Sequence, residues 1–145
     1  MSQTSYNLYP AAAYEGQILQ RDRIESRVAT ANIAFGRAVQ RVTSDRQVGL
    51  TAASGVIQGV AVRTHNNPND QAEDILTGQE VSVLSRGRFY GKAVGAVTQG
   101  ALAYAITAVG ATQGQFTATS TNNLLVGEFV TGGTDAIVEI EVNVA

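Results

Sequence analysis

The sequence has 145 residues and a mass of 15.2 kDa, with 44% hydrophobic residues, 15% charged residues and a formal net charge of −2. A chain of this length is enough for one domain that buries roughly two thirds of its unfolded surface. The absence of cysteine excludes disulfides and cysteine-based zinc sites. The charged share is below the roughly 25% of an average soluble domain. It therefore fits either a surface that is covered by other proteins or an ordinary threonine-rich β domain.

The first part of the chain, residues 1–33, is predicted to be an extended arm. It contains three of the five tyrosines within its first fourteen residues and shows neither a strand alternation nor a helical stripe there. The pattern of residues 18–32 leaves a short helix and an extended chain open. Because tyrosine offers a large contact area at low entropic cost, the arm is a candidate partner-binding segment. Its candidate partner-binding residues are Tyr6, Leu8, Tyr9, Tyr14, Ile18, Arg21 and Arg23.

No targeting or membrane segment is predicted. Met1–Pro10 has neither the basic region nor the apolar region of a signal peptide. The longest apolar run, Ala101–Ala111, is about half of the roughly 20 residues that span a bilayer. We therefore expect a soluble protein without a membrane partner.

The remainder, residues 34–145, is predicted to be a single β domain. Segments rich in β-branched and aromatic residues alternate with turn signals about every 8–12 residues, which is typical of sandwiches and barrels. The sequence predicts an all-β fold, either a jelly-roll-like sandwich or a small β-barrel of about eight strands. The predicted strands are Ala34–Thr43, Ile57–Thr64, Glu80–Ser85, Arg88–Val97, Leu102–Thr107, Gln115–Thr119, Glu128–Val130 and Val138–Val144.

The end of the chain carries the clearest strand pattern. Apolar residues occupy every second position from Val138 to Val144, with Glu139, Glu141 and an asparagine between them. A pair of glycines at 132–133 precedes this strand and predicts a tight hairpin turn, because both glycines can adopt positive φ. The predicted partner strand of the hairpin is Glu128–Val130.

Charge is unevenly distributed along the sequence. Residues 15–63 contain seven arginines and four acidic residues, whereas residues 64–145 contain three basic and eight acidic residues. Such complementary halves fit contacts between copies of the chain, or pairing between neighbouring strands of one chain.

The sequence contains no catalytic signature. No sequence motif indicates a nucleophile that His65 could activate, since there is no cysteine and no Gly-x-Ser-x-Gly motif. Asp70, Glu73 and Asp74 lack the spacing and the central glycine of a calcium-binding EF-hand loop. We therefore predict that the protein is not an enzyme and holds no cofactor or metal.

A glycine-flanked basic segment, residues 87–93, resembles a phosphate-binding loop only superficially. It has one residue too few between its glycines, and Ala93 stands where a serine or threonine would reach the magnesium ion. The segment also departs from the RNA-recognition strand consensus at Arg88. Together with the net negative charge, this argues against a nucleic-acid partner.

Several segments resemble, in order, the structural cement or capsid decoration proteins of tailed bacteriophages. The matching stretches are Ile33–Val39, Gly59–His65, Val81–Leu84 followed by Arg86 and Gly87, Gly95–Val97 with Gly100, Ala103 and Tyr104, and last Gly127–Val130 before Glu139–Asn143. Ala34 stands where many relatives have proline, and the arm matches the family less well. The resemblance implies a non-enzymatic viral structural protein on the outer surface of the capsid. It would bridge neighbouring subunits of the major capsid protein and associate with itself.

For the self-association, a homodimer is favoured because twofold interfaces are the commonest, with a trimer as the alternative. An alternative function is a carbohydrate-binding or receptor-binding β module of a phage fibre. That function needs an exposed aromatic groove, for which Phe89, Tyr90 and Tyr104 are the candidates.

Overall fold

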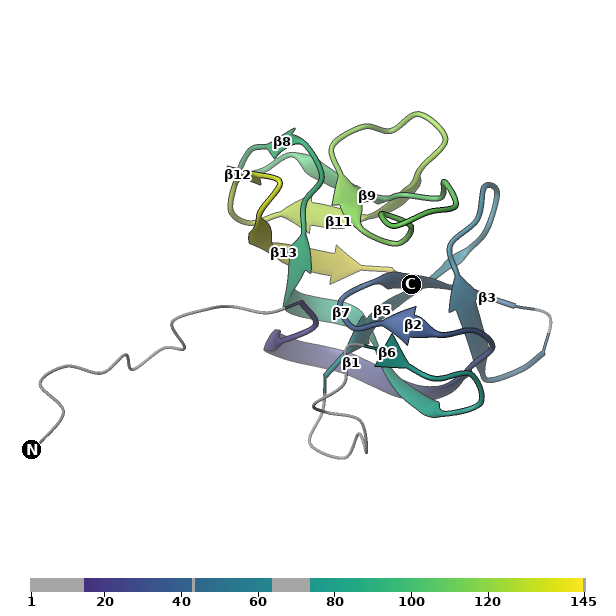
Figure 1. The fold of residues 1–145 in the computed structure, drawn as a ribbon. Helices are drawn as coiled ribbons and strands as arrows, with labels where there is room; N and C mark the ends of the chain where they lie inside the picture. Colours follow the sequence, from purple (N-terminus) through teal and green to yellow (C-terminus); the bar gives the residue numbers. More distant parts are fainter. Residues whose placement is uncertain (1–14, 43, 64–73, 145) are drawn as a thin grey trace, which may run out of the picture.

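The computed structural model describes residues 15–42, 44–63 and 74–144, and these ranges contain thirteen strands and no helix (Figure 1). Nine of the strands form one sheet in the order β1-β4-β3-β5-β7-β13-β11-β9-β10, and two small two-stranded sheets join β2 to β6 and β8 to β12. The strands are β1 (Ile18–Ala29), β2 (Ile33–Ala34), β3 (Ala38–Arg41), β4 (Gln47–Leu50), β5 (Ile57–Val62), β6 (Asp74–Ile75), β7 (Glu80–Lys92), β8 (Ala96–Val97), β9 (Leu102–Ala105), β10 (Phe116–Thr117), β11 (Leu124–Phe129), β12 (Gly133–Thr134) and β13 (Ile137–Asn143).

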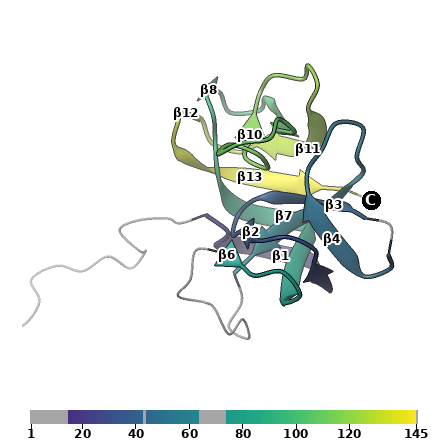
Figure 2. The same ribbon diagram turned by 45° about the vertical axis from the view of Figure 1, so that its right-hand side comes forward.

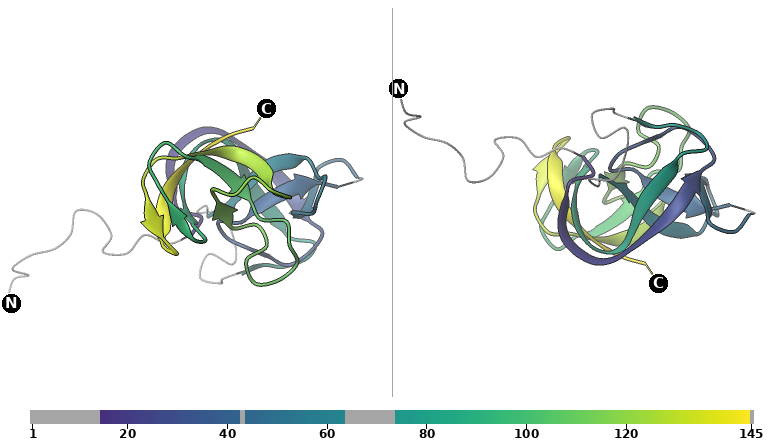
Figure 3. Two further views of the ribbon diagram at one scale, coloured as in Figure 1. Left: turned by 90° about the horizontal axis from the view of Figure 1, so that it is seen from above. Right: turned by 90° about the horizontal axis from the view of Figure 1, so that it is seen from below.

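Five of these strands close into a barrel. β1 pairs in parallel with β4 and antiparallel with β7, while β4, β3, β5 and β7 pair in succession. The ring of pairings therefore returns to its starting strand. The view from below in Figure 3 shows β1 and β7 curving around this barrel. Its interior holds a buried aliphatic cluster that includes Val39, Val48 and Val83.

The other strands of the main sheet form a second layer that continues from β7. The first half of β7 pairs with β5, and its second half, from Arg86 to Lys92, pairs with β13. β13, β11, β9 and β10 follow in order, and in Figure 2 β13 and β11 lie above β7. Three phenylalanines, Phe89, Phe116 and Phe129, are fully buried between this layer and the barrel.

The all-β prediction is confirmed, and most predicted strands are present with shifted ends. The two predicted strands 80–85 and 88–97 are one continuous strand as far as Lys92, because Gly87 keeps the chain paired at a φ of 142°. The predicted strand 34–43 is instead divided at Gly36, whose φ is 85°. Positive φ is accessible to glycine without strain, so one glycine continues a strand and another ends one.

The boundary of the predicted arm needs correction. Residues 18–29 are extended, which resolves the choice left open by the sequence, but they form β1, which pairs with β7 from Glu80 to Phe89, instead of an arm outside the domain. The pairing of β1 with β7 joins segments about sixty residues apart, so no local pattern predicts it. Residues 1–14 lie outside the described residues.

The predicted pairing at the end of the chain is confirmed, whereas its turn differs. β11 and β13 are antiparallel neighbours, with Glu128 opposite Glu141. Between them, Gly133 pairs with Val97 in the small β8–β12 sheet, and the residue with positive φ is Asp135, at 49°. The glycine pair is therefore not the hairpin turn. Gly132 instead sits where a Cβ would come within 2.8 Å of the Val97 carbonyl oxygen.

Candidate functional site: an arginine-lined barrel mouth

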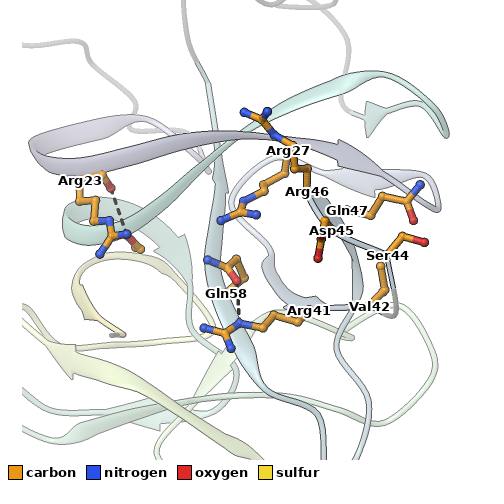
Figure 4. A pocket seen from close by; sticks show the side chains of 10 residues that line it. Arg23, Arg27, Arg41, Val42, Ser44, Asp45, Arg46, Gln47 and Gln58 are labelled. Atoms are coloured by element: carbon orange, nitrogen blue, oxygen red, sulfur yellow. Dashed lines mark hydrogen bonds between the residues drawn. The ribbon is translucent and has the colours of Figure 1, made fainter.

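One open end of the barrel, its mouth, is lined by polar side chains that lie next to the aliphatic core of the barrel. Strand side chains alternate between faces, so the residues two positions beyond the buried Val39 of β3 and Val83 of β7 also face the barrel axis. These residues are Arg41 and Ser85, and with Arg46 from the turn before β4 they line a pocket of about 570 Å³ (Figure 4). Its full lining is Arg23, Arg27, Arg41, Val42, Ser44, Asp45, Arg46, Gln47, Gln58 and Ser85. Strand alternation therefore places Arg41 and Ser85 at the mouth, and the turn before β4 adds Arg46.

A glutamate links two of these arginines along β1. The Nη2 atom of Arg23 donates to Oε1 of Glu25 at 2.7 Å, and Arg27 pairs with the other oxygen of the same carboxylate. Hydrogen bonds from Arg23 and then Arg27 hold the pKa of Glu25 below its usual range. Glu25 thus stays ionised and positions both guanidinium groups at the rim.

The opposite side of the mouth is formed by β5 and by the turn between β3 and β4. The β3–β5 pairing contains a register shift that leaves Gln58 as an extra residue, and Nε of Arg41 donates to its Oε1 at 2.9 Å. Arg46 lies in the turn with a φ of 66° and is exposed. Within the described parts of the chain, its side chain has no hydrogen bond or ion pair. Figure 4 shows these side chains arriving from separate strands.

The charge of the mouth suits an anionic guest. Four arginines line it, whereas the carboxylates beside them are Glu25 and Asp45. Guanidinium groups are planar donors that match carboxylate and phosphate oxygens two at a time. Beneath the mouth lie Val39, Val48 and Val83, which are fully buried. The mouth is thus an arginine-lined pocket, hereafter the socket, above an apolar interior.

An acidic surface lies on nearby strands of the second layer. Glu128 of β11 stands directly opposite Glu141 of β13, and Glu139 shares the outward face two residues along. Arg88 lies beside one of them, with its Nε 3.7 Å from Oε1 of Glu141. Like charges directly opposite in a sheet are destabilising, so this glutamate pair has a cost that a cationic partner would remove.

Residues 15–17, where the described part of the chain begins, are hydrogen-bonded to the domain. The amide of Gly16 donates to the carbonyl of Tyr90 at 2.9 Å, and the amide of Arg63 donates to the carbonyl of Gly16 at 2.8 Å. The guanidinium of Arg63 also donates to the carbonyl of Glu15 and stacks on Phe35 at 4.4 Å. The segment at residues 15–17 is thus bound to the domain.

The predicted partner-binding residues are divided between two settings. Tyr6, Leu8, Tyr9 and Tyr14 lie outside the described residues. Ile18 is half-buried and packs against the large core, whereas Arg21 and Arg23 are exposed on β1. Of the three predicted residues that the structure describes, Arg23 alone lines the socket.

No sequence pattern predicted the arginines that join Arg23 at the socket. Arg27, Arg41 and Arg46 carry no motif, and only the excess of arginine in residues 15–63 signalled them.

The aromatic groove required by the carbohydrate-binding alternative is not formed. Phe89 is fully buried and makes an edge-to-face contact with Phe116, with the ring centroids 5.4 Å apart. Tyr90 of β7 and Tyr104 of β9 are half-buried on strands that are separated by β13 and β11. One predicted groove residue is therefore a core residue, and the other two do not adjoin.

The described ranges show no metal centre and no membrane-spanning element. Among them, no three histidine or acidic side chains gather in a way that could hold a metal ion, and none of the segments is a helix long and apolar enough to cross a bilayer. His65, Asp70 and Glu73 lie outside these ranges, and Asp74 begins β6.

Comparison with known proteins gives a family and a fold. The family model described as "Structural cement protein (E217 gp24/Pam3 gp6)" matches residues 2–143. A search of curated proteins returned no match. A chain from a solved structure described as "The capsid of Myoviridae Phage XM1" superposes with a TM-score of 0.69 at 16% identity, covering 97% of this chain and 98% of that one. At that identity the superposition shows the shared fold.

Proposed function

The chain belongs to the phage structural cement protein family, and from this premise we propose that it binds the outer surface of the head and bridges neighbouring major capsid protein subunits. Membership of the family makes it a virion protein of the capsid, in a structural and not an enzymatic family. The family match over residues 2–143 is the observation that carries the proposal.

The molecule's composition and surface support a clamping role. A clamp adds contacts across the seams between capsomers and needs no catalytic groups. This agrees with a sequence in which no catalytic signature is found. Basic residues are mainly arginine, with a single lysine at position 92, and interfaces between proteins are enriched in arginine and depleted in lysine. Once a bridging molecule touches two capsomers, the second contact is intramolecular, and avidity rises by roughly 10²–10⁴.

We propose that the N-terminal residues supply part of the capsid contact, through Tyr6, Leu8, Tyr9 and Tyr14 together with Ile18, Arg21 and Arg23. The anchoring hydrogen bonds at Gly16 support this proposal, because a partner bound before residue 15 would be tied directly to the domain. We further propose that the protein acts as a homodimer, since twofold assemblies are the commonest.

Shell binding tests the function directly. Purified protein is added to mature heads that lack it, and binding is measured by co-sedimentation and by the temperature at which the shell releases its DNA. We expect saturable binding and a raised release temperature. Heads that neither bind the protein nor gain stability would refute the proposal.

Removing the N-terminal residues tests the arm. A variant without residues 2–14 keeps the anchor at Gly16, so we expect the unfolding temperature of the free protein to stay unchanged while shell binding weakens at least about tenfold. The matched control replaces the four proposed contact residues of this segment by serine at full length. Unchanged shell binding in both variants would remove the arm from the interface.

A further inference from the structure

We propose that the arginine-lined barrel mouth receives Glu128 and Glu141 of a second copy of this chain, so that two copies dock reciprocally. This inference rests on the homodimer put forward above and names its interface. Four observations carry it: opposite charge, unpaired groups, adjacency and exposed apolar area.

The charges of the two surfaces are complementary. The mouth has arginines at 23, 27, 41 and 46 with the carboxylates of Glu25 and Asp45, a formal excess of two positive charges. The acidic face has Glu128, Glu139 and Glu141 with Arg88, a formal excess of two negative charges. The guest that matches this socket in charge is therefore present on the chain itself.

Both surfaces have groups without strong partners among the described residues. There, neither Arg46 nor the side chains of Glu128 and Glu139 make an ion pair. The ion pair of Glu141 with Arg88, at 3.7 Å, joins side chains that are 46% and 41% exposed. Exposed pairs of this kind contribute little, so Glu141 remains available to bind an arginine elsewhere.

The two surfaces lie close enough for reciprocal docking. Arg23 of β1 is opposite Arg86 of β7, and Arg86 is also opposite Asn143 of β13, two residues from Glu141. The socket and the glutamates thus occupy neighbouring strands. In a twofold dimer each contact is made twice, with the partners exchanged, so each mouth can take the other copy's glutamates.

Exposed aliphatic residues surround the glutamates. Leu102 is directly opposite Glu128 and 50% exposed, Leu125 is 54% exposed on the same strand as Glu128, and Ile137 is 39% exposed on the strand of Glu141. An interface needs an apolar centre beside its charges, and these residues supply it on the second layer.

Charge exchange tests the proposal in free protein. One full-length variant carries Arg41→Glu and Arg46→Glu, and the other carries Glu128→Arg and Glu141→Arg. We expect each variant alone to self-associate at least about 100-fold more weakly than the wild type in sedimentation velocity, because close charge pairs are reversed. An equimolar mixture of the two variants should recover dimers. In each mixed pair, the socket with reversed charge meets the reversed charges of the other variant, and the unchanged socket meets the unchanged glutamates.

Controls separate this effect from folding and from net charge. Circular dichroism and unfolding temperature show whether each variant is folded. Thr112→Glu combined with Thr121→Glu changes the net charge as much as Arg46→Glu, but both exposed residues lie outside the pocket and the acidic strands, so we expect this variant to leave the dimer constant within about twofold.

Three results would overturn the proposal: a wild type that remains monomeric at millimolar concentration, variants that dimerise like the wild type, or a mixture that fails to recover dimers. If the Arg41→Glu/Arg46→Glu variant loses shell binding while its self-association is intact, the socket binds the capsid instead. Since shell binding is measured separately, the proposed function stands or falls independently of this dimer.

Discussion

The barrel and the second layer are both built from β-strands, but different side chains fill them. The second layer packs three buried phenylalanines and has a large core shared with the outside of the barrel. The barrel interior is a smaller aliphatic cluster with Phe35 as its one aromatic residue, and it ends in arginines at the mouth. The difference predicts that stability is concentrated in the aromatic layer, whereas one end of the barrel is polar.

The largest loss of stability should come from the aromatic layer. We expect Phe89→Ala to lower the free energy of unfolding by about 3–5 kcal/mol, because it removes a fully buried ring that packs on Phe116. Ile33→Val in the barrel should cost about 0.5–1.5 kcal/mol. Urea titration of both variants measures the contrast, and equal losses of the free energy of unfolding would show that stability is not concentrated in the aromatic layer.

The next effect should arise where β7 passes from the barrel to the second layer. A Cβ at Gly87 would lie 2.2 Å from the carbonyl oxygen of Gln20, and the residue has a φ of 142°. We expect Gly87→Ala to cost about 2–3 kcal/mol, through backbone strain and loss of β1–β7 pairing.

The matched control for that strain is Gly95→Ala. Gly95 also has positive φ, at 81°, but nothing lies within 4 Å of an added Cβ. Its cost should stay near 1 kcal/mol. If both substitutions cost the same in urea titration, steric contact at the junction is unimportant.

A smaller effect should appear as a pH dependence at the barrel mouth. Because Arg23 and then Arg27 lower the pKa of folded Glu25, its contribution is fully present above the ordinary glutamate pKa of about 4.3 and is lost as the pH falls through the folded pKa. Between pH 5 and pH 3, the Glu25→Gln variant should therefore lose less free energy of unfolding than the wild type. Urea titration at these two pH values measures the difference. Identical acid profiles would mean that the pair does not contribute.

The smallest effect on stability should come from the socket's unpaired arginine. Arg46→Asn keeps a residue that tolerates positive φ and removes one of several like charges, so we expect a change within about 0.5 kcal/mol. The same variant should weaken self-association. A large loss of stability would show that Arg46 is structural.

The sequence predicted the fold class and the terminal β11–β13 pairing, because alternation of apolar residues from Val138 onward is a local property of a half-buried strand. It failed for β1, where Arg21, Arg23 and Glu25 obscure any apolar alternation. It also missed β4 (Gln47–Leu50), which is too short and mixed for a periodic signal.

The candidate site was predictable only in part. An excess of arginine in residues 15–63 and the selection of Arg23 pointed toward the correct strand. The other socket residues are separated from it by up to sixty-two positions, as Ser85 is. Their meeting depends on which strands pair, and local sequence patterns do not specify strand order.

The sequence alone determined a cysteine-free all-β protein that lacks catalytic signatures and resembles phage cement proteins, because composition, periodicity and motif order are properties of the chain itself. Only the tertiary structure decided that β1 closes a barrel with β4 and β7 and that arginines from distant segments surround one mouth. Strand pairing between distant segments turns an excess of positive charge in the sequence into a socket with a defined position and size.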